Sequence, residues 1–512
     1  MSETSKIERL GDWAVGVVSP RRAAIRAHFR RMARDPEYQT ATMLGMRLMG
    51  YRAAGESGSK TPWFGGSSSA DAEILRDLPN LRNRSRELNR DDPVASGITN
   101  TFVSNVIGPG IVAQARTGDT EKNKRVESVW KERKDKLNPV DDLLHAEAQA
   151  LLLRKVFEDG DVLQKATKLS AQTPVWFETI EADRLATPTS LMSSTRDIRD
   201  GVERDAFGRP TRYHILKKHP GDTMSGFTAT TESDFRVRDA SVVKHLKLVK
   251  RPGQTRGVPA FHAILQDLRD LDLLILASLK RSQIAACLAV FIKSPTPANE
   301  LFDATADRHG YKLDQRIEPG MIFKLNPEEE VQTLIPNFPM PEFTPFIVML
   351  ARRIGAALGV SWQVVLKDFS DSTYSSARTD LLETRIVYTT LQKWFIDKYL
   401  RWEWRIVMDD AVLRGDPRMA GVASEEIDMV NWIPPGWKWV DPLKEAKATE
   451  VELAIGTTTL QTVCAAKGLD WEELAEQRAI EQKKLEELGL PVPFGAKVNP
   501  APDTATDDDD DT

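Results

Sequence analysis

The sequence predicts an α+β protein that is predominantly helical, and three observations carry this prediction. Residues 259–289 and 376–412 keep apolar side chains at helical spacing over many turns. Residues 158–249 change to short apolar segments separated by turn residues, a pattern typical of strands. A proline-rich stretch with one predicted strand, 322–325, separates the first long helix from another at 343–358. With 41% hydrophobic residues among 512, the chain can bury more than one core.

The amino-terminal half predicts helices that are separated by short breaks. Helices are expected at 71–77 and 81–90, with Pro79 as the interruption, and a third begins at Pro93 and ends at the Gly-Pro-Gly of 108–110. Two amphipathic helices are expected at 120–134 and 141–156. In the β-rich block, strands are predicted at 162–166, 176–180, 213–216 and 242–246, with a hairpin connection at 205–210.

The carboxy-terminal half predicts a polar loop at 359–375 before the helix at 376–412. A short strand at 432–440 and helices within 441–488 follow, and a tail begins at residue 491. Six of the twelve tryptophans lie between Trp394 and Trp439. Exposed tryptophans could stack on single-stranded bases, but the helical spacing of Trp394 and Trp402 favours packing against neighbouring elements.

Composition excludes several classes of protein. Cys287 and Cys464 are the only cysteines, too few for a disulfide framework or a cysteine-based zinc site. No apolar run approaches the ~18 residues of a membrane span, and residues 1–11 lack the apolar core of a secretory signal. The net charge is −5, whereas tight DNA binders are usually basic. Residues 1–50 nevertheless form a basic arm, and Asp507–Asp511 an acidic run expected to be a solvated, disordered tail.

Enzyme motifs are weak throughout the sequence. Residues 55–61 resemble a phosphate-binding loop but lack its glycine spacing, and a flexible loop is the favoured interpretation. Asp159 and Asp161 could pair for metal or acid–base chemistry, although their Glu-Asp-Gly-Asp context is typical of a turn before a strand. The seven histidines, His262 included, are scattered. We therefore expect no catalytic residues, no metal and no cofactor.

Several segments, taken in order, resemble the portal proteins of lambda-type tailed bacteriophages, the head–tail connectors. The first, 85–111, reads SRELNRDDPVASGITNTFVSNVIGPGI; the others are 201–215 with 219–222, 353–360 with 374–378, and 432–436 with 440–446. Together they cover about residues 70–488. Each segment alone is weak, and their shared order carries the resemblance.

The resemblance implies a portal fold, in which a ring of usually twelve copies sits at one capsid vertex. Its regions would be a wing with a β-rich block, a stem, a small β-containing clip and a crown. The implied regions are wing 1–258, stem helices 259–289 and 343–358, clip 290–342, tunnel loop 359–375, long helix and wing return 376–440, crown 441–490 and acidic tail 491–512.

The resemblance also implies partners and a site. The ring would pass double-stranded DNA during packaging and ejection, and would contact the terminase large subunit, a head–tail adaptor, and the major capsid and scaffold proteins. It would be assembled in the bacterial host cytoplasm, would end in the virion and would involve no membrane. The implied DNA-contacting residues of the tunnel loop are Lys367, Asp368, Ser370, Asp371, Ser372 and Tyr374.

Two alternatives remain open at this point. The chain could be a metal-dependent DNA-processing enzyme that uses Asp159 and Asp161. It could instead be a cytosolic adaptor that binds partners through its basic arm and acidic tail. Without the resemblance, residues 359–375 are an ordinary helix–helix connection.

Overall fold

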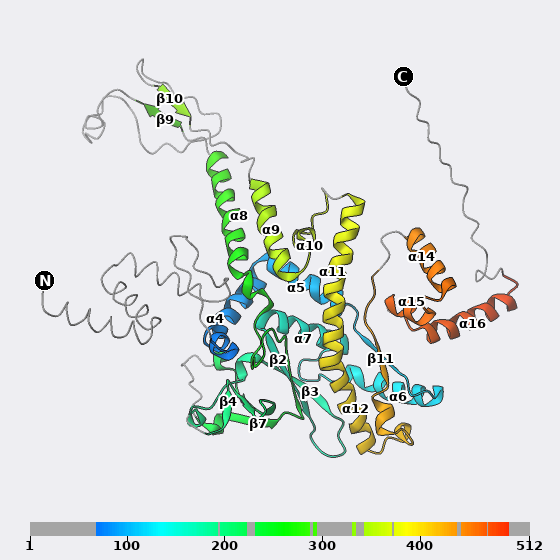
Figure 1. Cartoon of the computed structure of the whole chain (residues 1–512). Helices are drawn as coiled ribbons and strands as arrows, with labels where there is room; N and C mark the ends of the chain where they lie inside the picture. The colour runs from blue at the N-terminus through cyan, green and yellow to red at the C-terminus, as the bar shows by residue number, and fades with distance from the viewer. Residues whose placement is uncertain are drawn as a thin grey trace, which may run out of the picture. The chain divides into compact units, whose positions relative to one another are not determined.

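The computed structural model describes residues 68–192, 195–222, 231–286, 290–293, 330–333, 343–370, 373–437, 442–467 and 469–490 (Figure 1). The chain divides into two compact units, one of residues 1–79 with 249–256 and one of residues 80–248 with 257–512. Helix α4 (Ala70–Asp91) begins in the first unit and ends in the second. None of the helices within the described ranges has the length and hydropathy that crossing a membrane requires.

In the smaller unit, the start of α4 is bonded to the segment 249–256. The Asp71 carboxylate accepts hydrogen bonds from the backbone N–H and the hydroxyl of Thr255, both at 2.7 Å. Arg251 forms an ion pair with Glu73. The Gln254 side chain accepts the backbone N–H of Lys250 at 2.9 Å. Side-chain oxygens thus satisfy backbone donors that a loop would otherwise leave without partners.

The larger unit is organised around a helical core. Asp92 caps α5 by accepting the N–H of Ala95 at 2.7 Å, and Pro93 occupies the first helical position, where its missing N–H costs nothing. The Phe102 ring of α5 packs edge-on against Tyr388, with ring centroids 5.3 Å apart. The helices of this core are α5 (Pro93–Val106), α6 (Thr120–Arg133), α7 (His145–Asp159), α11 (Tyr374–Phe395) and α12 (Arg401–Leu413).

Small antiparallel sheets flank this core. One has the order β3-β2-β8 and pairs Leu163 with Ile180 on one side and with His245 on the other. The second has the order β4-β5-β6-β7. The strands are β2 (Asp161–Thr167), β3 (Trp176–Glu181), β4 (Asp197–Arg199), β5 (Val202–Arg204), β6 (Pro210–Leu216), β7 (Phe235–Asp239) and β8 (Val243–Lys247). All four predicted strands of the block and the hairpin are confirmed.

Two further strand pairs join distant parts of the chain. Strand β1 (Val112–Ala115) pairs with β11 (Val430–Ile433), so the segment that follows α5 lies beside the segment that follows α12. Strand β9 (Val290–Lys293) pairs with β10 (Glu330–Thr333), within the segment implied to be the clip. The predicted strand at 322–325 lies outside the described residues.

Helices α8 (Leu265–Ala286) and α9 (Phe343–Leu358) precede and follow that segment in the sequence, and they pack against each other (Figure 1). Arg353 of α9 donates to Asp267 of α8 at 3.1 Å. The predicted bounds of α9 are confirmed. Helix α8 begins later than predicted, because a 3₁₀ turn, η6 (Ala260–Ala263), precedes it. After β11 come α14 (Pro442–Ile455), α15 (Leu460–Ala466) and α16 (Trp471–Glu487), and the first turn of α16 is tied to the β1 region by an Arg116–Glu472 ion pair.

Further predicted boundaries are wrong, including those of α7, expected at 141–156, and of β11, expected at 432–440. Pro79 lies inside α4 rather than interrupting it; Leu78 and Arg82 on either side are buried, and this burial offsets the lost backbone hydrogen bond. The polar loop 359–375 contains a short helix, α10 (Trp362–Leu366), because Val364 and Val365 are buried. The long helix begins at Tyr374 rather than at residue 376 and contains a π-helical turn, η8 (Ile396–Leu400).

The entry into the α8 segment requires two glycines in backbone contact. Gly160 ends α7 with φ +91°. A Cβ atom added at Gly257 would lie 2.0 Å from the Gly160 carbonyl oxygen, and one at Gly160 would lie 2.5 Å from the Val258 carbonyl carbon. No side chain fits between the two backbones, so both positions require glycine.

We expect Gly257→Ala to lower the free energy of unfolding by about 2–3 kcal/mol, because the backbone has to move to admit the methyl group. The matched control is Gly97→Ala on α5, where an added Cβ meets nothing within 4 Å. Because alanine favours helix more than glycine does, the control should be neutral or stabilising by up to ~1 kcal/mol. Chemical denaturation measures both, and equal stabilities would contradict the close approach.

Candidate functional site

The connection between α9 and α11 holds the residues implied to contact DNA. Gly359 ends α9 with φ +72°, and the Val360 N–H donates to the Gly355 carbonyl oxygen at 3.0 Å. The buried apolar residues of α10 then anchor the connection against α9 and α5. The segment is thus attached to the core at its beginning, and it leaves the core at Lys367.

Lys367 and Asp368 share one exposed turn. Lys367 adopts the left-handed conformation, with φ +59°, and its N–H caps α10 on the Gln363 carbonyl oxygen. Partial burial lowers the pKa of the Lys367 ammonium. The Asp368 carboxylate accepts the hydroxyl of Ser370 at 2.6 Å and its N–H at 3.0 Å, and these bonds lower the pKa of Asp368. The turn therefore presents one cation, one anion and a hydroxyl side by side.

The remaining predicted residues are placed less completely. Thr373 caps α11 by accepting the Ser376 N–H at 3.3 Å, so Tyr374 is the first helical residue and not a loop residue. Asp371 and Ser372 lie outside the described residues. The structure therefore brings Lys367, Asp368 and Ser370 together, and the contact of these residues with DNA stays a prediction.

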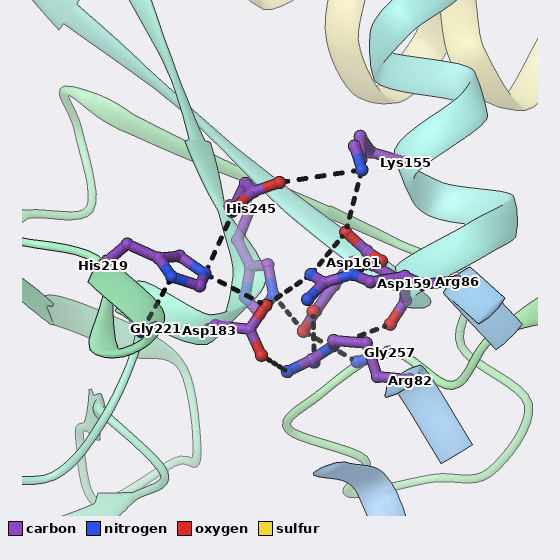
Figure 2. Close-up of polar contacts among 11 residues, drawn as sticks. Arg82, Arg86, Lys155, Asp159, Asp161, Asp183, His219, Gly221, His245 and Gly257 are labelled. Carbon is purple, nitrogen blue, oxygen red and sulfur yellow. Dashed lines mark hydrogen bonds and ion pairs between the residues drawn. The ribbon is translucent and has the colours of Figure 1, made fainter. Parts of the chain in front are cut away.

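Asp159 and Asp161 lie in a buried network of ion pairs (Figure 2). Arg86 donates two hydrogen bonds to Asp159, at 2.6 and 2.9 Å. Arg82 donates to Asp161 at 3.1 Å, and the side chains of this pair are 4% and 0% exposed. Asp161 also accepts the Gly257 N–H at 3.0 Å and lies 2.9 Å from His245 Nε2.

Asp183 completes the network between the two arginines, binding Arg82 at 3.4 Å and Arg86 as a second ion pair (Figure 2). Burial raises the pKa of Asp183, but the charges of Arg82 and Arg86 outweigh burial, and the net pKa is lowered. For Asp159, burial outweighs Arg86 and Lys155, and the pKa is raised. The arginines and aspartates of this network are 73 to 101 positions apart in the sequence. No local sequence motif therefore predicts it.

Three potential metal ligands lie at the edge of this network. Within the described ranges, Glu181, Asp183 and His219 have ligand atoms within 4.8 Å of one another. His219 Nδ1 accepts the Gly221 N–H at 3.0 Å, so the proton of a neutral His219 ring sits on Nε2 (Figure 2). Nε2 points at the Glu181 carboxylate, 3.3 Å away. A metal on Nε2 would need the proton on Nδ1 and would break the bond to Gly221, so the arrangement favours a neutral His219 with Nε2–H beside Glu181 over metal binding.

This network argues against the nuclease hypothesis. A hydrolytic metal site needs carboxylates that are open to a cation and to substrate. Asp159 and Asp161 are instead fully buried and bonded to arginines. Their role is to hold the end of α7 and the start of β2 against the end of α4 and Gly257.

The described helices also expose large apolar side chains on their surfaces. Leu276 on α8 is 44% exposed, and Ile386 on α11 is 68% exposed. Exposed apolar side chains that form one patch are typical of surfaces that another protein covers, whereas single ones are common on any surface. The exposed set on α8, α9 and α11 comprises Leu273, Ile275, Leu276, Leu279, Phe346, Met349, Leu382 and Ile386.

Comparison with known proteins gives a consistent result. The model of the lambda family of phage portal proteins matches residues 56–392. The probable portal protein of Halomonas phage phiHAP-1 is 25% identical, with 96% of this chain and 98% of the relative covered. Portal protein B of Escherichia phage lambda is 21% identical, with 87% and 92% covered.

Solved structures of gene transfer agent particles also align with the chain. A chain of a native virion aligns with TM-score 0.43 and 15% identity, covering 88% of this chain and 99% of the other. A chain of the native neck, computed with C12 symmetry, aligns with TM-score 0.44 and 14% identity, covering 81% and 94%.

We expect Asp161→Asn to lower the free energy of unfolding by about 3 kcal/mol or more, because it leaves Arg82 buried without its full counter-charge. The matched control is Asp91→Asn, whose ion pair with Arg90 at 2.8 Å is exposed and should contribute little. Chemical denaturation compares the two variants. Metal-dependent cleavage of plasmid DNA that is lost in folded Asp159→Asn protein would revive the nuclease hypothesis.

Proposed function

The chain belongs to the lambda family of phage portal proteins, a structural and non-enzymatic family of the virion, and we propose that it forms the DNA channel at one capsid vertex. The observation that carries this proposal is the family match over residues 56–392. In this role the protein would pass double-stranded DNA inward during packaging and outward during ejection. It would be assembled in the bacterial host cytoplasm before it enters the virion.

The ring would be a homododecamer in which each copy contacts two neighbours through different surfaces. Such a heterologous interface closes when the rotation between copies divides a full turn. The exposed apolar side chains of α8, α9 and α11 support this proposal, since apolar area of this kind is stabilised when a neighbour covers it. A single copy leaves these side chains in water.

We assign the implied regions to the described elements as follows. The stem consists of η6, α8 and α9, and the clip of 290–342 with its β9–β10 pair. The wing consists of 1–258 with the long helix and return at 376–440, including the buried network. The crown consists of 441–490, with α14 to α16, and the acidic tail follows.

The segment 359–375 would face the channel and touch DNA through Lys367, Asp368, Ser370, Asp371, Ser372 and Tyr374. A channel must contact the polyanion without holding it, and binding tightens with each phosphate that a cation neutralises. The exposed turn supports this role because Lys367 is accompanied by an ionised Asp368 and a hydroxyl. Mixed charge of this kind allows weak contacts that form and break as DNA moves.

The partners follow from the same proposal. The terminase large subunit would dock at the clip and supply ATP hydrolysis, and a head–tail adaptor would bind after packaging. The major capsid and scaffold proteins would surround the wing. The chain itself would then need only to hold its shape and bind these partners in turn.

We expect Leu276→Glu to block ring formation while the subunit stays folded, because the charge would have to be buried between copies. The matched control is Leu169→Glu, at a residue that is 80% exposed on a loop of the wing. Negative-stain electron microscopy and light scattering should show rings for the control and smaller species for Leu276→Glu. Rings of normal size in both variants would contradict the assignment of α8 to the interface.

We expect Lys367→Ala, Asp371→Ala and Tyr374→Ala to reduce DNA packaging or retention with little effect on ring assembly. The matched control is Lys218→Ala, at an exposed lysine outside this segment. Complementation of a portal-deficient phage, scored by packaged DNA per particle, measures the effect. Normal packaging in all three variants would show that the segment does not line the channel.

A further inference from the structure

A half-open pocket of about 410 Å³, called the cavity below, lies between β8, the second sheet and the π-helical turn η8. Its size is within the range of pockets that hold small ligands. It is lined by Pro210, Tyr213, Ala240, Val243, Lys244, His245, Leu246, Lys247 and Lys398. None of these lining residues is a carboxylate, and Lys244 and Lys398 are two of the lysines among them.

Lys244 and Lys398 lie near each other in this cavity, and their charges repel. Burial lowers the pKa of Lys244, and the charge of Lys398 lowers it further. Within the described part of the chain, neither ammonium has a carboxylate partner. The nearest acid along the helix, Asp397, is bonded to Arg401 at 3.1 Å. Lys244 and Lys398 thus differ from Arg82 and Arg86 of the wing, which form ion pairs with aspartates.

The backbone at Lys398 has an uncommon conformation that sets the direction of its side chain. Lys398 is the middle residue of η8, where the Arg401 N–H bonds to the Ile396 carbonyl oxygen five residues earlier. A π-helical turn of this kind adds one residue to the helical repeat and re-aims the side chains, and such turns are frequent at functional sites. The turn packs against β8, which carries Lys244.

Tyr213 adds a neutral donor to the lining. Burial raises the pKa of the Tyr213 hydroxyl to about 12, and the charge of Asp161 acts in the same direction. The hydroxyl therefore keeps its proton at neutral pH and can donate to an oxyanion. Two ammonium groups and a phenol therefore line the same pocket.

We propose that this cavity binds a phosphate group, held by Lys244 and Lys398 with Tyr213 as a further donor. Lysine is a common phosphate ligand because its ammonium acts as a compact charge. Two excess positive charges match the charge of about −1.5 to −2 that a phosphate monoester carries. The phosphate would come from a free phosphate compound or from the backbone of a nucleic acid. This site is separate from the proposed channel segment.

A solvated edge strand is the simpler interpretation of the same lysines. Strand β8 is an edge of its sheet, and edge strands often carry lysine to prevent aggregation. Such lysines point into solvent, where they keep their ordinary pKa and stand apart. Lys244 is half-buried and lies near the exposed Lys398 of another element, and protection of an edge does not require this arrangement.

The test compares pyrophosphate binding by the full-length protein and three variants at constant ionic strength. Calorimetry should detect binding by the wild type and about tenfold weaker binding by Lys244→Gln and by Lys398→Gln. Lys393→Gln, an exposed lysine on the same long helix, is the matched control and should bind as the wild type does. Without ligand, Lys398→Gln should melt at the same or a higher temperature than the wild type, because the repulsion is removed.

A second measurement identifies the source of the phosphate. If a short DNA duplex displaces pyrophosphate from the wild type, the pocket takes a nucleic-acid backbone, and if it does not, the pocket takes a small phosphate compound. Undetectable pyrophosphate binding, or equal binding in the wild type and all three variants, would overturn the proposal. Lower stability of unliganded Lys398→Gln would also count against it, since the lysine would then be part of the packing. None of these results bears on the connector assignment, which rests on the family match.

Discussion

The constraint on which the wing depends is the contact between the backbones at Gly160 and Gly257. The two backbone segments approach each other too closely for any side chain to fit between them. Asp161 fixes this approach by accepting the Gly257 N–H. Burying that carboxylate is costly unless cations and donors surround it, so Arg82 and His245 are required beside it. The direction in which the chain enters α8 is thereby set by charges buried in the wing.

Two parts of the chain thus differ in what they bury. The wing buries charged side chains, whereas the helices α8 and α11 expose apolar side chains. In the wing, Arg82 and Asp161 pair with side chains that are 4% and 0% exposed, and removing either partner would leave a buried charge. On α8 and α11, Leu276 and Ile386 remain in water. Such a subunit has a fixed shape but leaves apolar side chains uncovered. A second copy of the same chain is the simplest partner that would cover them.

The sequence predicts what is local and misses what is not. The bounds of α9 follow from apolar spacing, and the start of α5 follows from Pro93. Strand β1 is missed because its partner, β11, lies more than 300 residues away. The buried network is missed for the same reason, since Arg86 and Asp183 are 97 residues apart. Asp159 and Asp161 are noticed as a pair, but only the structure shows that arginines already occupy them.

The distribution of charge links the channel to the cavity at Lys398. A chain of net charge −5 that handles DNA cannot spread cations along its path without slowing the polymer. On the turn at 367–370, Lys367 is followed directly by Asp368, whose carboxylate accepts the Ser370 hydroxyl. In the cavity, neither Lys244 nor Lys398 has a carboxylate partner within the described residues, and burial and the Lys398 charge lower the pKa of Lys244. A charge imbalance confined to one pocket gives specific binding of one anionic group, whereas the same cations spread over a surface would give only general adhesion to DNA.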